Sequence, residues 1–398
     1  MCGIVGVLGR HEAAPIIVEA LKRLEYRGYD SAGIATIHND KLDRRRAVGK
    51  LIHLQDLLVH DPLPGKSGIG HTRWATHGSP TQGNAHPHRS GPVAVVHNGI
   101  IENFRELRAD LAAKGLMQET ETDTETVAML ANYYLSQGNS PRDAAAQVLA
   151  RLEGAFALCF LFEGDDDLLI AARRGPPLAV GHGEGEVFVG SDAIALGPLT
   201  DQITYLEDGD WAVLTRDSVE ILDSHGRRAN RPVTRVQLDM TRVDKAGHRH
   251  FMGKEIAEQP TVLGDAIAHY AHAGEITLPE PGLDFTTYDR ITMVACGTAF
   301  YACLTAKYWF EQIARLPVEV DVASEFRYRE PPIPDRSLAM FVSQSGETAD
   351  TLAALRYCEE KAATIASIGN VTESSIARAS DLILPNRAGT ELGVATTK

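Results

Sequence analysis

The sequence predicts a two-part protein: a strand-rich α+β part with two packed sheets and outer helices (αββα), followed by an α/β part with a doubly wound parallel sheet (αβα). Three observations support this prediction. The first portion mixes short apolar strands with amphipathic helices. The composition of the sequence changes near Leu238, where a polar segment begins. Beyond Gly282, apolar strands alternate regularly with helices, which is typical of a parallel sheet covered on both faces.

Short apolar runs and helical periodicity assign the elements of the first part. Ser140 is the expected N-cap and Pro141 the expected first residue of a helix over 141–152. The other expected helices cover 14–25, 102–114 and 124–136. The expected strands cover 4–8, 33–37, 69–75, 93–97, 155–162, 168–172 and 187–190.

The second part follows a polar stretch over 239–259, a predicted helix that runs to Ala271, and the Pro-Gly stretch 279–282. These segments have the composition of a linker. Beyond them, strands are expected over 291–295, 318–322, 338–342 and 365–368, with helices over 300–314 and 348–361.

Composition indicates an ordinary globular protein. The 398 residues are enough for two or three domains, and 44% hydrophobic with 23% charged residues is a typical balance. A net charge of -14 argues against nucleic-acid binding, which depends on clustered Lys and Arg. The basic run Arg44-Arg45-Arg46 is therefore predicted to be a solvated loop.

The five cysteines have no paired metal-ligand spacing, and their number is odd. This usage predicts a reducing compartment without a disulfide framework. No apolar run of about 18 residues and no signal peptide is visible, so neither a membrane partner nor secretion is expected. The predicted location is the cytoplasm.

Cys2, directly after Met1, is the first candidate catalytic residue. If Met1 is removed, this residue owns both a thiol and a free α-amine. The pKa of an α-amine is about 7.7 to 8.0, against about 8.5 for a thiol, so the amine can serve as the base. Nucleophile and base in one residue suit acyl transfer. The alternative is a small apolar residue that opens a buried strand.

Three further clusters of the first part are candidates to complete a site around Cys2. Arg73, after an apolar strand, can bind a carboxylate with two parallel hydrogen bonds. The amide of Asn98 and the backbone N–H of Gly99 would make an oxyanion hole. Asp123, before a helix, could hold an ammonium group. The structural alternatives are a helix cap for Asp123, a core position for Trp74, and solvated loops for the histidines His77, His86 and His88.

In the second part, a hydroxyl-rich turn over 343–348 lies between a strand and a helix. Backbone N–H groups at a helix N-terminus attract anions, and hydroxyls of Ser343, Ser345 and Thr348 add donors for a phosphate. An earlier strand ends similarly in 296–298. Neither turn carries a nucleotide-binding fingerprint, which favours a compact phosphomonoester. The alternative is simple helix capping.

Taken together, these runs resemble the glutamine:fructose-6-phosphate aminotransferases, the glucosamine-6-phosphate synthase family of N-terminal-nucleophile glutamine amidotransferases. The matching runs occur in order over essentially the whole chain. They are 2–6, 25–33, 70–78, 97–99, 121–125, 252–256, 295–298 and 343–348.

The resemblance implies roles for the candidate residues. Cys2 would attack the side-chain amide of glutamine, and Asn98 with Gly99 would stabilise the oxyanion. Ammonia would leave, and water would hydrolyse the remaining thioester. The residues expected to bind glutamine are Arg73 for the carboxylate, Asp123 for the amine, and Arg27, Trp74, Thr76 and His77 around them. In the family, the residue matching Trp74 gates an internal ammonia channel.

The resemblance also implies a sugar substrate. Fructose 6-phosphate would place its phosphate on Ser343, Gln344, Ser345 and Thr348, with Thr298 nearby, and the product would be glucosamine 6-phosphate. No metal and no organic cofactor is expected, and full-length members would form a homodimer. The implied domains are an amidotransferase domain over 1–238, a linker with a connecting helix over 239–281, and a first sugar-isomerase domain over 282–398.

Two departures from the family pattern limit the expectation. Ala299 stands where many members have a serine, which removes one sugar contact. The sequence stops at Lys398, where members continue into a second sugar-isomerase domain. The chain is therefore expected to hydrolyse glutamine only. The alternatives are an inactive sugar-phosphate-binding or sensor fragment, and another class II glutamine amidotransferase.

Overall fold

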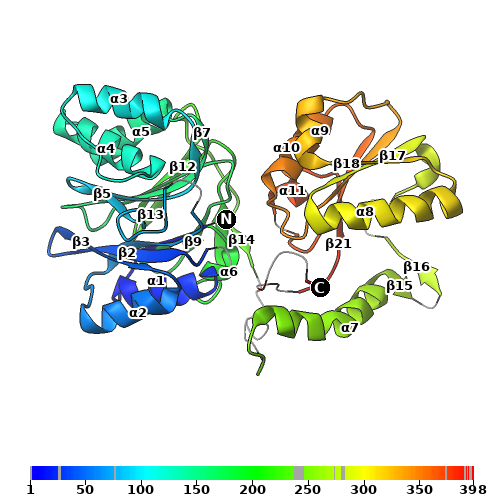
Figure 1. Cartoon of the computed structure of the whole chain (residues 1–398), viewed down its shortest axis with the longest axis horizontal. Helices are drawn as coiled ribbons and strands as arrows, with labels where there is room; N and C mark the ends of the chain where they lie inside the picture. Colours follow the sequence, from blue (N-terminus) through cyan, green and yellow to red (C-terminus); the bar gives the residue numbers. More distant parts are fainter. Residues whose placement is uncertain are drawn as a thin grey trace. The chain divides into compact units, whose positions relative to one another are not determined.

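The computed structural model divides the chain into two compact units, Met1–Met240 and Thr241–Lys398 (Figure 1). The structure describes residues 2–25, 28–75, 78–236, 246–272, 274–278, 283–372, 374–389, 391, 393 and 397–398. Among these residues, none of the helices combines the length and the apolar character needed to cross a bilayer.

The first unit contains two stacked antiparallel sheets. The eight-stranded sheet has the order β14-β11-β9-β10-β1-β4-β2-β3, and the six-stranded sheet has the order β13-β12-β8-β7-β6-β5. The strands of the larger sheet are β1 (Gly3–Leu8), β2 (Ser31–His38), β3 (Lys41–Val48), β4 (Ser67–Arg73), β9 (Ala179–His182), β10 (Val187–Gly190), β11 (Gln202–Tyr205) and β14 (Thr234–Arg235). Those of the smaller sheet are β5 (His88–Ser90), β6 (Val93–Ile101), β7 (Gly154–Phe162), β8 (Leu169–Arg174), β12 (Trp211–Thr215) and β13 (Ser218–Leu222).

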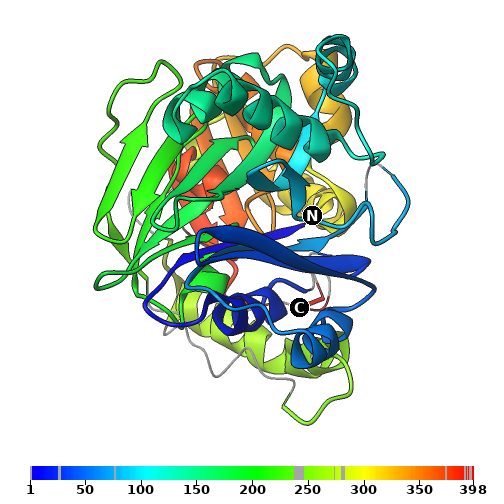
Figure 2. The ribbon, with the colours of Figure 1, turned by 90° about the vertical axis from the view of Figure 1, so that its left-hand side faces the viewer.

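Helices cover the outer face of each sheet, and the αββα prediction is confirmed (Figure 2). The larger sheet is covered by α1 (Ala13–Lys22), α2 (Leu51–His60) and α6 (Ala193–Leu196). The smaller sheet is covered by α3 (Phe104–Ala113), α4 (Asp123–Ser136) and α5 (Pro141–Arg151). Three apolar clusters fill the spaces: one beneath each helix layer and one between the sheets.

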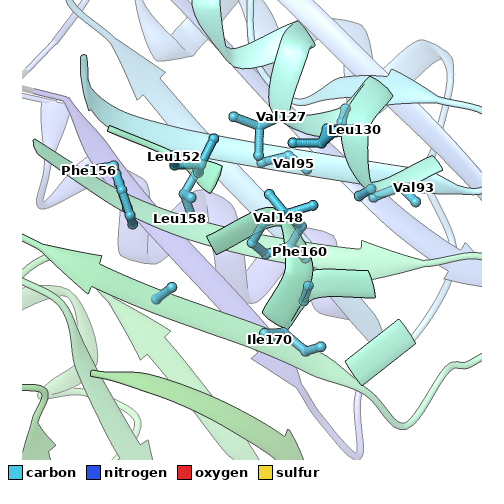
Figure 3. Close-up of a cluster of buried hydrophobic side chains, with 14 of the residues drawn as sticks. Val93, Val95, Val127, Leu130, Val148, Leu152, Phe156, Leu158, Phe160 and Ile170 are labelled. Atoms are coloured by element: carbon cyan, nitrogen blue, oxygen red, sulfur yellow. The ribbon is translucent and has the colours of Figure 1, made fainter. Parts of the chain in front are cut away.

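Figure 3 shows how the layer beneath α4 and α5 is built. Val127 and Leu130 of α4 and Val148 of α5 meet Val95 and Phe160 of the strands below. All five side chains are fully buried. Ser140 accepts a hydrogen bond from the backbone N–H of Asp143 and so caps α5 as expected, with Pro141 in its first turn.

The second unit is an αβα sandwich around a parallel sheet, as predicted. The sheet has the order β18-β17-β19-β20-β21, and every neighbouring pair runs parallel. Its strands are β17 (Arg290–Ala295), β18 (Val318–Val322), β19 (Ser337–Val342), β20 (Thr364–Gly369) and β21 (Leu382–Pro385).

Side chains of the central strands alternate between two apolar clusters, because successive residues of a strand point to opposite faces. One face is covered by α8 (Gly297–Trp309) with the π-helical turn η4 (Phe310–Ala314). The other is covered by α9 (Ala323–Arg329), α10 (Ala349–Cys358) and α11 (Ser375–Arg378). Before the sheet come α7 (Phe251–Tyr270), the hairpin β15 (Ala271–His272) and β16 (Glu275–Ile276), and the 3-10 turn η3 (Phe285–Thr287).

The expectation for the basic run Arg44-Arg45-Arg46 is wrong. The basic run 44–46 is not a solvated loop but part of strand β3. Arg44 donates to the carbonyl of Pro87, and Arg46 donates to the carbonyls of Gly83 and Ala85. The guanidinium groups of this strand are accommodated because their N–H groups bond to backbone carbonyls of a loop that is distant in the sequence.

Candidate functional site

Cys2 lies directly before β1, which is a central strand of the larger sheet between β10 and β4. Its Sγ accepts a hydrogen bond from the backbone N–H of Trp74 at 3.2 Å and lies 3.5 Å from the carbonyl oxygen of the same residue. The thiol is partly buried and takes part in no disulfide. The end of β4 therefore holds the sulfur in place.

A glycine makes this arrangement possible. A Cβ at position 28 would lie 2.5 Å from the carbonyl carbon of Arg73 and 2.8 Å from the nitrogen of Trp74. Only a residue without a side chain allows this approach. Next to it, the Asp30 carboxylate accepts a hydrogen bond from the backbone N–H of Ala75. The segment around Gly28 thus fixes the backbone that contacts the thiol.

Burial raises the pKa of the Cys2 thiol above its ordinary value. The N–H of Trp74 lowers this pKa, the Asp30 carboxylate raises it, and the Arg73 cation lowers it, but burial is the largest effect. The thiol is therefore protonated near neutral pH, and a reaction at sulfur requires a base.

Asn98 and Gly99 lie on β6, in the other sheet, and β6 runs through them to Ile101 instead of ending at residue 97. The Asn98 Nδ2 donates to the carbonyl oxygen of Cys2 at 2.9 Å. Gly99 is exposed and has a φ of 127°, and a Cβ there would lie 2.0 Å from the carbonyl oxygen of Ala155. The Asn98 amide thus lies beside the residue that carries the thiol, and Gly99 follows it on the same strand.

Arg73 and Asp123 are both buried. The Arg73 guanidinium donates to the carbonyl oxygens of Gly78 at 3.2 Å and Ser79 at 3.4 Å, and it is close enough to lower the pKa of Cys2. The Asp123 Oδ2 accepts from the backbone N–H of Ile101 at 2.9 Å. Asp123 is the first residue of α4, but the N-cap is Thr122, which accepts from the N–H of Glu125, so capping does not account for Asp123.

Trp74 is not a core residue, because 47% of it is exposed. Its indole meets the ring of Tyr29 edge to face at a centroid distance of 5.4 Å. The remaining expected glutamine-binding residues, Arg27, Thr76 and His77, lie outside the described residues.

Three buried histidines form a group that the sequence analysis did not identify as such. His86 and His88, taken at most for loop residues, are 6% and 1% exposed, and His71 is fully buried. The ring centroids of His71 and His86 are 4.1 Å apart, and those of His86 and His88 are 4.8 Å apart. Burial lowers the pKa of His71 to about 3 and the pKa of the other two well below the ordinary value. His71 lies on β4, whose sequence also contains Ser67, Thr72 and Arg73, so no local pattern indicated this burial.

In the second unit, the two candidate phosphate turns follow β17 and β19. These strands are parallel neighbours, with Ala295 opposite Val342, so the turns meet at the same edge of the sheet. The Ser343 Oγ lies 3.0 Å from the Thr348 Oγ1 and accepts from the N–H of Gly346. The Ser345 Oγ accepts from the N–H of Glu347 at 3.2 Å.

These hydroxyls precede α10, for which Thr348 is the N-cap without a side-chain cap bond. Gln344 accepts through its backbone carbonyl from the N–H of Asn370. Thr298 is exposed in the first turn of α8, and Ala299 packs against the apolar cluster beneath that helix. Among the residues that the structure describes, no group of three or more His, Cys, Asp or Glu side chains is arranged to hold a metal ion.

Two family models match the chain. A glutamine amidotransferase domain matches residues 71–198, and an SIS domain matches residues 284–398. The first range contains Arg73, Asn98 and Asp123, and the second contains both hydroxyl-rich turns.

Curated relatives match over the whole chain. The "Glutamine--fructose-6-phosphate aminotransferase [isomerizing]" of Brucella abortus is 62% identical over 400 residues, and that of Zymomonas mobilis is 54% identical over 400 residues. In both cases the match covers 100% of this chain and 66% of the relative, so the chain spans about two thirds of their length. A solved structure described as the allosteric regulatory enzyme of purine biosynthesis has a TM-score of 0.50 at 21% identity, covering 92% of this chain and 80% of that chain. This last likeness concerns the fold alone.

Proposed function

Because the chain belongs to the glutamine–fructose-6-phosphate aminotransferase family, we propose that its first unit hydrolyses glutamine to glutamate and ammonia, with Cys2 as the nucleophile. The observation that carries the proposal is the meeting of three groups at Cys2. The N–H of Trp74 donates to the sulfur, and the Asn98 Nδ2 donates to the Cys2 carbonyl. The positive charge of Arg73 lowers the pKa of the thiol.

The proposed reaction begins with removal of Met1, which frees the α-amine of Cys2. The amine takes the thiol proton, and the sulfur attacks the side-chain carbonyl carbon of glutamine. The carbon–nitrogen bond of the tetrahedral intermediate breaks, and the amine passes its proton to the departing nitrogen, which leaves as ammonia. Water then cleaves the thioester to give glutamate and restore the thiol. The raised pKa of the thiol supports the need for such a base.

The other residues of the proposed site stabilise charged groups of the substrate and of the intermediate. The Asn98 Nδ2 and the Gly99 N–H would donate to the oxyanion of the tetrahedral intermediate. Arg73 would bind the α-carboxylate of glutamine and Asp123 its α-ammonium, since both are buried charges of the required sign. Arg27, Trp74, Thr76 and His77 complete the proposed glutamine site.

The test compares the parent protein with Cys2→Ala in a glutamate-release assay, after mass spectrometry has established the N-terminal residue of the parent. We expect release by the parent and none by the variant. A glutamine analogue with an electrophile in place of the amide should add one equivalent of mass to the parent at Cys2 and nothing to the variant. Equal glutamate release by the two proteins would disprove the mechanism.

For the second unit, we propose binding of fructose 6-phosphate through Ser343, Gln344, Ser345 and Thr348, with Thr298 nearby. The shared edge of β17 and β19, the three hydroxyls before α10 and the SIS match support this assignment. Calorimetric titration with fructose 6-phosphate and with fructose separates phosphate recognition from sugar recognition. Binding of both with equal affinity would contradict a phosphate site.

The names of the relatives support the wider proposal that the family transfers the amide nitrogen of glutamine to fructose 6-phosphate. The proposed product is glucosamine 6-phosphate. We propose the domain boundaries 1–238, 239–281 and 282–398, a homodimer, and a cytoplasmic location. For this chain, the proposed activity is restricted to glutamine hydrolysis, because the described residues supply groups for that half of the reaction. Synthesis of glucosamine 6-phosphate by the purified chain would contradict the restriction.

A further inference from the structure

The side chain of His71 connects the two sheets of the first unit at the proposed oxyanion site. His71 lies on β4, opposite Ile4 of β1, whereas Asn98 lies on β6 of the other sheet. The His71 Nε2 is 2.9 Å from the carbonyl oxygen of His97 and 3.0 Å from the Asn98 Oδ1. His71 is fully buried. These two bonds join it neither to the sulfur of Cys2 nor to Arg73 or Asp123, the residues proposed to bind the α-carboxylate and α-ammonium of glutamine.

The types of the contacting atoms fix the protonation state of His71. A backbone carbonyl can only accept, so Nε2 must carry the proton in order to bond to His97. A third neighbour, the His86 Nδ1 at 3.2 Å, is then also an acceptor. Among the described residues, the buried Nδ1 of His71 has no hydrogen-bond partner, which suits a bare lone pair and not an N–H. The pKa of His71, which burial lowers to about 3, agrees with a neutral ring.

The same reasoning fixes the orientation of the Asn98 amide. Its Nδ2 faces the carbonyl oxygen of Cys2, an acceptor, and its Oδ1 faces the His71 Nε2–H, a donor. A 180° turn of the amide would set oxygen against oxygen at Cys2 and N–H against N–H at His71. Both contacts would then be repulsive, so the proton on His71 selects one of two amide orientations.

We propose that His71 is a positioning residue for glutamine hydrolysis, whose Nε2–H holds the Asn98 amide with its N–H donors toward the backbone carbonyl of Cys2. The proposal rests on the proposed function of Cys2 and adds to it the residue that orients the oxyanion donor. Loss of the His71 donor would lower the rate of the chemical step without removing a contact to the α-carboxylate or α-ammonium of glutamine.

The test uses two substitutions at the same buried position in the full chain. His71→Leu removes the donor, whereas His71→Gln retains an N–H donor at a similar reach. We expect His71→Leu to lower kcat for glutamate release by about 10- to 100-fold with KM within about threefold, and His71→Gln to recover most of the loss. His182→Leu is the control. Among the described residues, the His182 Nε2 bonds to the Thr204 Oγ1 at a distance of 2.8 Å, and both residues lie on strands that β10 separates from β1.

Each outcome decides the proposal. Unchanged kcat in His71→Leu, an equal loss of kcat in His71→Gln, or a rise in KM alone overturns it. If His71→Leu does not fold, ¹⁵N chemical shifts of the His71 ring in the parent protein decide: the neutral Nε2–H form supports the proposal, and the Nδ1–H form or the imidazolium overturns it. Cys2→Ala separates the two levels of inference, because glutamate release by that variant overturns the proposed function whatever the His71 variants do.

Discussion

At the scale of single residues, adjacent positions at the end of β4 act in different ways. The backbone of Trp74 contacts the Cys2 thiol, while the preceding side chain of Arg73 is buried and bonded to the carbonyls of residues 78 and 79. The planar guanidinium suits a carboxylate ligand because two of its N–H groups can bond in parallel.

Arg73→Lys keeps the charge but removes the second parallel bond. We expect KM for glutamine to rise by about 10-fold or more, with a smaller change in kcat, because the lost contact is to a part of the substrate that does not react. Steady-state glutamate release measures both constants. Arg235→Lys, at an exposed ion pair with Asp201, is the control and should leave both constants unchanged. A loss confined to kcat would contradict a carboxylate-binding role.

The sequence predicted single residues unevenly. Cys2, Asn98 and Asp123 were chosen as candidates because their residue types suit chemistry and their positions flank predicted elements. The structure brings Asn98 to Cys2, and the roles of all three residues stay predictions. The buried histidines were missed because nothing local distinguishes a loop histidine in water from one packed beneath a second sheet. His71, for example, bonds from β4 to His97 and Asn98 on β6 of the other sheet, a contact between strands that are distant in the sequence.

At the scale of elements, most strand ends of the apolar strands were predicted, for example those at Leu8, Phe162 and Val342, whereas those of β4 and β6 were not. The N-cap at Ser140 is a local signal and was correct. The end of β4 was expected at residue 75 but lies at Arg73, where the chain turns toward Cys2. The strand formed by the run 44–46 was missed because its acceptors come from residues 83–87, which no local pattern reveals.

Two of the helices of the first unit that have a side-chain N-cap, α4 and α5, allow a matched comparison. Ser140 caps α5, which is away from the candidate site, and Thr122 caps α4, whose first residue is Asp123. Each change to alanine should lower the free energy of unfolding by about 1 kcal/mol. Only Thr122→Ala should also raise KM for glutamine, because it loosens the turn that holds Asp123. Denaturant unfolding and the glutaminase assay measure the two effects, and a KM change in Ser140→Ala would refute the local explanation.

At the scale of the whole molecule, each unit has its own apolar core. Phe160 is fully buried in the first unit and Phe341 in the second. The αββα and αβα classes were predictable because strand and helix order follow from the hydrophobic pattern. The strand order of the larger sheet was not, since it joins strands from both ends of the first unit.

Separate cores predict separate unfolding. Phe160→Ala and Phe341→Ala should each destabilise by about 3 to 5 kcal/mol. In scanning calorimetry, we expect each variant to lower the temperature of a different transition and to leave the other in place. If both variants shift one common transition, the chain unfolds as a single cooperative body, and the expectation is wrong.

The buried histidines predict the acid stability of the first unit. They are neutral in the folded state because burial depresses their pKa, whereas the unfolded chain takes up protons below about pH 6.5. Their contribution to stability is therefore complete above about pH 6.5 and is lost as the pH falls toward the folded-state pKa, at up to about 1.4 kcal/mol per pH unit for each group. Measuring the free energy of unfolding at a series of pH values tests this. Below about pH 6.5, His71→Gln should reduce the slope of this free energy against pH by the amount that corresponds to about one proton.

The place of β1 in the larger sheet also has a consequence during synthesis. Its two neighbours are β4 and β10, and β10 ends at Gly190. The strand next to Cys2 leaves the ribosome early but cannot gain its second neighbour until most of the first unit has been translated. During that interval the N-terminus is open to the peptidase that would remove Met1, so the order of the strands gives processing time to precede the closing of the site.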